Sequence, residues 1–241
     1  MASDGAPADP ERFPEASKWF REKVAVTRDE WSTMTYEARA QSFTIAGAQQ
    51  LDAVQTVMDS LQSAIDKGTP IDEWRKNVRE SLGKKFGKLN ASHLDTAFIN
   101  AHQSAYNAGR WEQLSDSSVT AALPYRKFDA VLDSRVSDRC KACAGTILPH
   151  DDPWWLTHWP PLHHRCRSTV RALSARMAKR AGGVTNKPSV AASGDFGLAP
   201  GAKAGVWEPD LSKYESHAAR EYTKKQRSMR AREAKKRSKS A

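Results

Sequence analysis

All three cysteines of this 241-residue chain lie in one short window, and their spacing constrains the fold more than any other feature. Cys140 and Cys143 form a Cys-x-x-Cys pair, and Cys166 follows directly after the stretch that contains His163 and His164. Paired thiols followed by a histidine and another thiol at this distance are typical of zinc ligands. The window therefore predicts a closed, structural zinc site made by the three cysteines and one of the two histidines.

The loop between these ligands, residues 148–159, gives a physical reason for a metal site. Its prolines oppose regular secondary structure, whereas Trp154, Trp155 and Trp159 favour burial. Structural zinc supplies about 10 kcal/mol or more of apparent binding free energy, which is comparable with the net stability of a domain. A bound ion would therefore hold this loop in one conformation.

The same residues are compatible with two other interpretations. An isolated Cys-x-x-Cys pair is also the pattern of a redox-active pair, and Cys166 fits an ordinary buried thiol. His150 and His158 are expected to be hydrogen-bonded or solvated loop residues. The chain has no apolar run that would span a bilayer and no signal peptide at its N-terminus, so we expect a soluble protein made in the reducing cytoplasm, where thiols favour metal over disulfides.

The positive charge is concentrated at the C-terminus. Residues 211–241 contain eleven Lys and Arg residues against three Glu residues, which accounts for +8 of the net charge of +10. This segment has too few apolar residues to form a core and is expected to be a solvated arm or one that binds nucleic acid through phosphates. The residues expected to bind nucleic acid are Lys224, Lys225, Arg227, Arg230, Arg232, Lys235, Lys236, Arg237 and Lys239.

Apolar residues at helical spacing predict helices through the first half of the chain, over residues 13–24, 36–67, 71–82 and 92–110. Gly68 is placed to end the second helix, and a capping box beginning at Ser92 is expected to start the last one. That last helix also carries a polar face, which is expected to be a satisfied rim. Its residues are Asn100, Gln103, Tyr106, Asn107 and Arg110.

Strands are predicted over residues 125–133, 146–148 and 168–172, so helices come first and short strands then surround the cysteines. This order predicts an α+β fold in which a helical N-terminal part precedes a small β-containing zinc-knuckle module. The predicted divisions are a disordered lead-in over 1–11, a helical part over 12–118, the knuckle part over 119–180, a Gly/Pro/Ala linker over 181–209 and a flexible basic tail over 210–241.

Five stretches, in this order, resemble the Mu F-like phage head morphogenesis family: residues 14–24, 96–111, 128–135, 151–155 and 160–167. The resemblance covers about residues 12–175. It implies a minor capsid protein of a tailed bacteriophage, present in several copies near the portal vertex of the virion and assembled in the bacterial cytoplasm. The implied role is head assembly and retention or delivery of packaged DNA, with no enzymatic reaction.

The resemblance also implies partners and a ligand set. The expected partners are the portal protein or the major capsid protein, and packaged double-stranded DNA through the basic tail. Family members with a metal knuckle have Cys-x-x-Cys followed by His-x-x-Cys, which assigns the histidine ligand to His163. Relatives often end in Cys-Arg-Cys, whereas Ser168 stands at the last of these positions here.

Two functional alternatives remain. A zinc-supported HNH-type endonuclease would explain the histidine pair beside cysteine ligands and the basic charge. It needs a general-base histidine and further metal ligands downstream, but the next histidine is His217 in the tail. The other alternative is a free cytoplasmic DNA-binding protein, which location in the cell would distinguish from a virion component.

Overall fold

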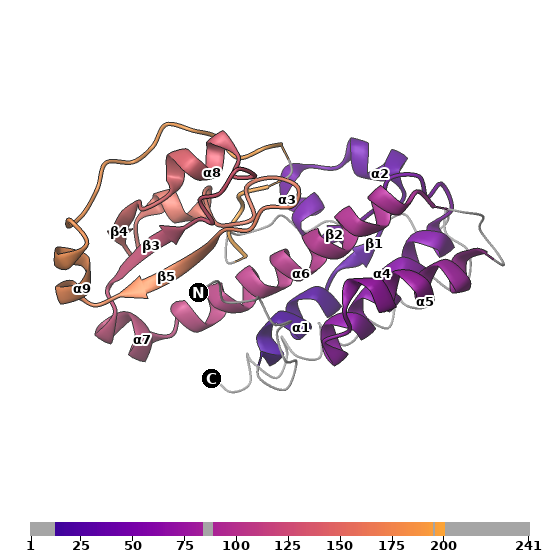
Figure 1. The fold of residues 1–241 in the computed structure, drawn as a ribbon, viewed down its shortest axis with the longest axis horizontal. Helices are drawn as coiled ribbons and strands as arrows, with labels where there is room; N and C mark the ends of the chain where they lie inside the picture. Colours follow the sequence, from indigo (N-terminus) through magenta and orange to yellow (C-terminus); the bar gives the residue numbers. More distant parts are fainter. Residues whose placement is uncertain (1–12, 84–88, 195, 201–241) are drawn as a thin grey trace, which may run out of the picture.

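The computed structural model describes residues 13–83, 89–194 and 196–200. Two large hydrophobic cores lie along one long central helix, with a helical layer at one end and a three-stranded sheet at the other (Figure 1). Within these ranges no helix combines the length and the apolar character that crossing a bilayer requires. In chain order the elements are α1 (Pro14–Arg21), β1 (Val24–Ala25), α2 (Arg28–Thr33), α3 (Tyr36–Ala40), β2 (Ser42–Phe43), α4 (Leu51–Lys67), α5 (Ile71–Gly83), α6 (Ala91–Leu114), α7 (Ser117–Ala122), β3 (Tyr125–Asp129), α8 (Asp138–Cys143), β4 (Ile147–Pro149), the 3-10 helix η1 (Pro153–Leu156), β5 (Thr169–Leu173) and α9 (Ala175–Arg180).

The first half of the predicted helix over residues 36–67 is wrong. The chain forms α3 and β2 there, and β2 pairs in parallel with β1. Gly47 then adopts a φ of +88°, a left-handed conformation that a continuing α-helix excludes. The second half is confirmed as α4, which buries its apolar stripe and ends at Gly68 with a φ of +65°.

Helices α1, α4, α5 and α6 enclose the first core. The prediction for residues 71–82 is confirmed by α5, which buries Trp74, Val78 and Leu82. The indole N–H of Trp74 donates to the Ser60 hydroxyl of α4 at 3.0 Å, so this large side chain is both buried and satisfied. These contacts fix the helical layer against the N-terminal half of α6.

The start of α6 differs from the predicted capping box. Asn90 is the N-cap, and its side chain accepts a hydrogen bond from the Ser92 N–H at 2.8 Å. Asp95, the predicted acidic member of the box, instead accepts from Arg75 of α5 at 2.7 Å. The N-cap is therefore two residues earlier than the predicted Ser92, and Asp95 joins α6 to α5.

The second core lies between the C-terminal half of α6 and an antiparallel sheet of order β4-β3-β5. The three predicted strands are confirmed, although β3 ends at residue 129 rather than 133. Central β3 buries Phe128, which lies opposite Val170 of β5. Trp154, Trp155 and Trp159 are all buried beside it, so the described chain has the predicted α+β architecture.

The described part of the predicted linker packs against the second core. Its Ala199 side chain is buried, and Gly197 exchanges backbone hydrogen bonds with the loop that follows η1, donating to Pro161 and accepting from Trp159. Small residues and backbone hydrogen bonds hold this segment in place where large apolar side chains are few. The lead-in over 1–11 and the tail over 210–241 lie outside the described residues.

Candidate metal centre

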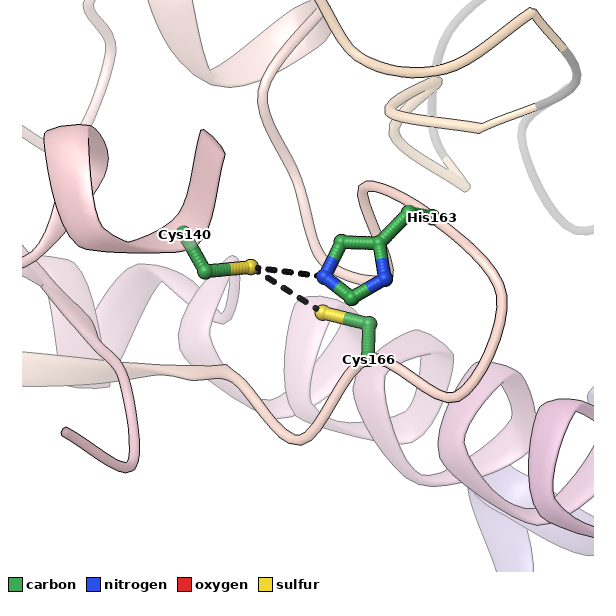
Figure 2. A group of neighbouring side chains, drawn as sticks. All are labelled: Cys140, His163 and Cys166. Carbon is green, nitrogen blue, oxygen red and sulfur yellow. Dashed lines mark hydrogen bonds between the residues drawn. The ribbon is translucent and has the colours of Figure 1, made fainter. Parts of the chain in front are cut away.

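Three of the four predicted metal ligands converge in the second core. Cys140 comes from α8, whereas His163 and Cys166 come from the loop between η1 and β5 (Figure 2). The Sγ atom of Cys140 lies 3.2 Å from Nε2 of His163 and 3.6 Å from Sγ of Cys166. The potential ligand atoms all lie within 4.8 Å of one another.

These distances suit a zinc ion. With zinc–sulfur bonds of about 2.3 Å and zinc–nitrogen bonds of about 2.0 Å, a tetrahedral site separates two sulfurs by about 3.8 Å and a sulfur and a nitrogen by about 3.5 Å. Both cysteines are buried, so the sulfurs face one another rather than water. The donor set of two thiols and an imidazole is one that zinc prefers.

The hydrogen bonds of His163 orient its ring for this role. Its Nδ1 atom lies 2.7 Å from the backbone oxygen of His164, so Nδ1 carries the proton and donates it to that carbonyl. The lone pair is then on Nε2, which faces Cys140 and lies 2.8 Å from the hydroxyl of Ser137. Fixing the tautomer through the opposite ring nitrogen is the usual arrangement for a metal-ligating histidine.

Cys143, the fourth predicted ligand, is buried one helical turn after Cys140 on α8 but is not a member of the three-residue group. Burial raises the pKa of the Cys143 thiol to about 11, and the charge of Cys166 adds to this shift. Ser168 also reaches the group, because its buried hydroxyl hydrogen-bonds the sulfurs of Cys140 and Cys166. Ser168 therefore contacts the cluster directly, whereas Cys143 is near enough to Cys166 for that residue's charge to affect it.

The two clustered thiols differ in their ease of ionisation. The hydrogen bond from the Cys140 thiol lowers the pKa of Cys166, and the same bond, together with burial, raises the pKa of Cys140. Backbone N–H groups at Leu162 and Ser168 also lower the pKa of Cys166. Cysteines bind metals as thiolates, and Cys166 is the more easily deprotonated of the two.

The polar face of α6 holds the loop that carries His163 and Cys166. Arg165 adopts a left-handed φ of +58°, and its backbone N–H donates to Oδ1 of Asn100 at 2.8 Å. The Nδ2 atom of Asn100 lies 2.7 Å from Nδ1 of His164, which turns that histidine toward α6. The Nε atom of Arg165 also donates to the Thr96 hydroxyl at 3.0 Å. His164 is thus a member of this support rather than of the cluster.

Further along α6, the same face binds the segment that leads into β5. Asn107 donates to the backbone oxygen of Ser168 at 3.1 Å, and Arg110 donates to that of Val170 at 3.1 Å. The polar face predicted as a satisfied rim is satisfied only in part, because Oδ1 of Asn107 and Nε of Arg110 are buried with no hydrogen-bond partner among the described residues. The partners that the face does have are the loop that carries His163 and Cys166 and the segment that leads into β5. The helical spacing of these side chains predicts that they share one face of α6, but it does not identify the segments that this face binds.

Other residues near the cluster are engaged in structural contacts. Arg167 forms a two-pronged ion pair with Asp133, which lowers the pKa of that carboxyl well below its usual range, and a backbone hydrogen bond from Arg135 adds to the effect. His158 is a hydrogen-bonded loop residue, as expected, with Nε2 2.7 Å from the Val190 oxygen. The nucleic-acid-binding residues predicted in the tail lie outside the described ranges.

Comparisons with known proteins agree with the predicted resemblance. Residues 55–171 match the family described as Phage Mu protein F like protein. A protein of Escherichia phage Mu, named as a candidate capsid assembly protein F, is 30% identical over 186 residues, which make up 70% of this chain and 42% of that protein. The Mu-like prophage FluMu F protein of Haemophilus influenzae is 29% identical over 157 residues, or 60% of this chain and 37% of that protein.

This chain spans about two fifths of the length of these curated relatives. No solved structure matches it. The matched range nevertheless begins in α4 and ends in β5, and so includes α6, the sheet and the cluster of Cys140, His163 and Cys166. Through residues 55–171, the chain belongs to the family of phage Mu protein F like proteins.

Proposed function

We propose that this protein is a structural component of tailed-phage heads, a minor capsid protein that acts in head morphogenesis. The observation that carries the proposal is the extent of the family match, because it runs through both hydrophobic cores and the cluster between α8 and β5. A relative named for capsid assembly aligns with 70% of this chain at 30% identity. The finer proposal is a position near the portal vertex, with a role in retaining or delivering packaged DNA.

A structural role also agrees with the chemistry of the cluster. Both ring nitrogens of His163 have partners, and His164 is bound to Asn100 of α6. Cys140 and Cys166 are buried, His163 is half-buried, and surrounding hydrogen bonds hold the donors, as in closed metal sites that stabilise a fold. An HNH-type endonuclease would instead need a histidine directed toward a water and a phosphate. The geometry therefore favours a non-enzymatic protein.

We infer that the cofactor is one structural zinc ion. Cys140, His163 and Cys166 would hold it, with Cys143 as the fourth ligand from the same turn of α8. When bound, zinc would cross-link α8 to the loop before β5. The Ser168 hydroxyl lies within reach of both sulfurs and would donate its proton to one of them, which partly offsets the negative charge that two or three thiolates bring into the site.

The proposed partners are the portal protein or the major capsid protein, and packaged double-stranded DNA. DNA contacts would come from the basic tail, acting through phosphates and weakening steeply as salt increases. The protein would act in several copies in the virion, after assembly in the host cytoplasm. Deletion of residues 211–241 should therefore remove most of its DNA affinity and leave the folded part intact.

The test uses the phage or prophage that encodes the chain. Its gene is deleted, particles are purified, and the protein is quantified in complemented particles by mass spectrometry. We expect the protein in complemented heads and a loss of DNA-filled infectious particles without it. Infectious, DNA-filled heads that lack the protein would reject the proposal.

A second assay addresses the nuclease alternative. Purified protein is incubated with plasmid in magnesium or manganese, next to the His164→Ala variant. We expect intact plasmid in both samples. Cleavage that disappears in His164→Ala would establish the endonuclease instead.

A further inference from the structure

A cavity of about 470 Å³ lies between the helical layer and the loop that holds the metal cluster. Its described lining comes from the N-terminal elements, from α6, and from the segments around Pro160 and Phe196. Figure 1 shows why these parts meet, since the segment after α9 returns across the molecule toward α2 and α3. Ligand pockets are typically about 300–1,000 Å³ and occur where structural units meet.

The lining is aromatic and basic. Trp19, Phe43 and Phe196 contribute rings, while Lys23 and Arg28 are among its basic residues. The Nζ atom of Lys23 lies 4.0 Å from the centroid of the Trp19 ring and donates to the Ala40 oxygen, and burial lowers the pKa of Lys23 to about 7. The full positive charge of the lining therefore comes from its arginines, such as the exposed Arg28. No aspartate or glutamate occurs among the described residues that line the cavity. Such a site favours an aromatic group that is accompanied by negative charge.

The chain itself provides a group of this kind close to the cavity. Pro200 lines the cavity and is the last residue that the structure describes. Trp207 follows seven residues later; Glu208 stands directly after it, and Asp210 is three residues beyond it. Seven extended residues span at most about 25 Å, so the indole has enough chain to return to the cavity. A short tether of this type gives an effective concentration in the millimolar range.

We propose that residues 206–211 of the same chain occupy this cavity. The indole of Trp207 would lie against the aromatic lining, and the carboxylates of Glu208 and Asp210 would face the basic residues at its rim. The sequence supports this choice of occupant, because two acids beside a tryptophan stand immediately before a segment with a net charge of +8. Docking there would fix the point from which the basic tail leaves the folded protein. The inference does not depend on the proposed role in the phage head.

Fluorine NMR of the full chain, labelled with 5-fluorotryptophan, tests this inference. The Trp207 resonance is assigned from its absence in Trp207→Phe, and its exposure is measured from the solvent isotope shift between water and deuterium oxide. We expect a buried Trp207 in the unmodified chain. Arg28→Glu should move that resonance to an exposed position, because it places an acid opposite Glu208 and Asp210.

Arg79→Glu is the matched control, since Arg79 is also exposed but lies on α5 outside the cavity lining. It should leave the Trp207 resonance unchanged. As a second measurement, a synthetic peptide of residues 203–213 is added to the full-length Trp207→Ala chain, and we expect saturable binding. Adding Arg28→Glu to that chain should weaken the binding at least about ten-fold, or about 1.4 kcal/mol. A solvent-exposed Trp207 in the unmodified chain, or equal responses to both charge reversals, would overturn the inference.

Discussion

Nε2 of His163 lies 3.2 Å from Sγ of Cys140, although His164, the next residue, is turned away and bonded to Asn100. Two adjacent histidines thus have different structural roles. One completes the cluster in the second core, and the other attaches the same loop to α6. This difference gives a direct test of the proposed zinc site.

His163→Ala should abolish stoichiometric zinc binding, whereas His164→Ala should retain it. Loss of an outer-shell partner typically costs about 10- to 100-fold in metal affinity, and loss of a ligand should cost more than that. In His164→Ala the backbone oxygen that accepts from Nδ1 of His163 is still present. Metal analysis by mass spectrometry of the purified proteins measures the difference. Equal zinc content in the two variants would show that His163 is not a ligand.

Gly109→Ala should destabilise the protein by about 1–3 kcal/mol, a typical cost of forcing extra volume into a packed core. A Cβ atom at Gly109 would lie 2.7 Å from the ring of Phe13 and 2.9 Å from the backbone nitrogen of Ala16, so α1 would have to move. Gly83→Ala is the control, because no atom lies within 4 Å of a Cβ there. Urea unfolding measures both. A loss at Gly109 no larger than that at Gly83 would contradict the close packing.

Arg126→Lys should lower the free energy of unfolding by about 2 kcal/mol, although the positive charge is kept. The Arg126 side chain is only 3% exposed, and its guanidinium lies 4.8 Å from the ring centroid of Trp111 and 5.3 Å from that of Trp159. It also donates to the Leu114 carbonyl at the end of α6. A lysine ammonium cannot reproduce the planar stacking and the directed hydrogen bonds together.

The control for Arg126→Lys is Arg171→Lys on neighbouring β5. Arg171 is 67% exposed and pairs with Asp129 at the surface, where ion pairs contribute about 0–1 kcal/mol. Its replacement should change the unfolding free energy by less than about 0.5 kcal/mol. Thermal unfolding followed by circular dichroism distinguishes the two variants, and similar losses for both would refute the proposed stacking effect.

His102 should make the protein less stable as the pH falls below 6.5. Burial lowers the pKa of His102 from its ordinary value, although the hydrogen bond with the Phe98 oxygen opposes the shift. Between the ordinary and the lowered pKa, the unfolded chain binds a proton that the folded chain does not, so stability falls as the pH drops through this window. His102→Gln should therefore reduce the loss of unfolding free energy between pH 7.5 and pH 5.

Other groups also respond to acid, so the measurement for His102 is a difference between two chains at two pH values. The contribution of every other group is common to both chains and cancels. An identical pH dependence of urea unfolding in His102→Gln and in the unmodified protein would exclude His102 as a source of acid sensitivity.

Local sequence signals predicted the parts of the fold that depend on neighbours in the chain. Gly68 ends α4 in a left-handed conformation, and the apolar spacing of Trp74, Val78 and Leu82 places them on the buried face of α5. The cysteine and histidine spacing predicted that the three cysteines would meet one of the two histidines, and the family resemblance assigned that place to His163. Cys140, His163 and Cys166 do lie together, whereas Cys143 is not a member of the group.

Signals that depend on distant partners were harder to interpret. The short pairing of β1 with β2 has no periodic pattern, and apolar spacing alone therefore predicts that the helix of residues 36–40 continues through β2. The segment before Pro200 has few large apolar residues, yet backbone hydrogen bonds and the buried Ala199 attach it to the second core. Asn100 and Asn107 were recognised as polar, but their partners are more than sixty residues away in the chain.

Helix α6 contributes buried residues to the first core through Leu94 and Ala105 and to the second through Leu114. Its 24 residues make a rod about 36 Å long. The two halves of the molecule therefore share one continuous helix rather than a hinge. The turn at Arg165 is hydrogen-bonded to Thr96 and Asn100 of this same helix, so a load on the helical layer should reach the cysteine cluster through α6, without any separate relay.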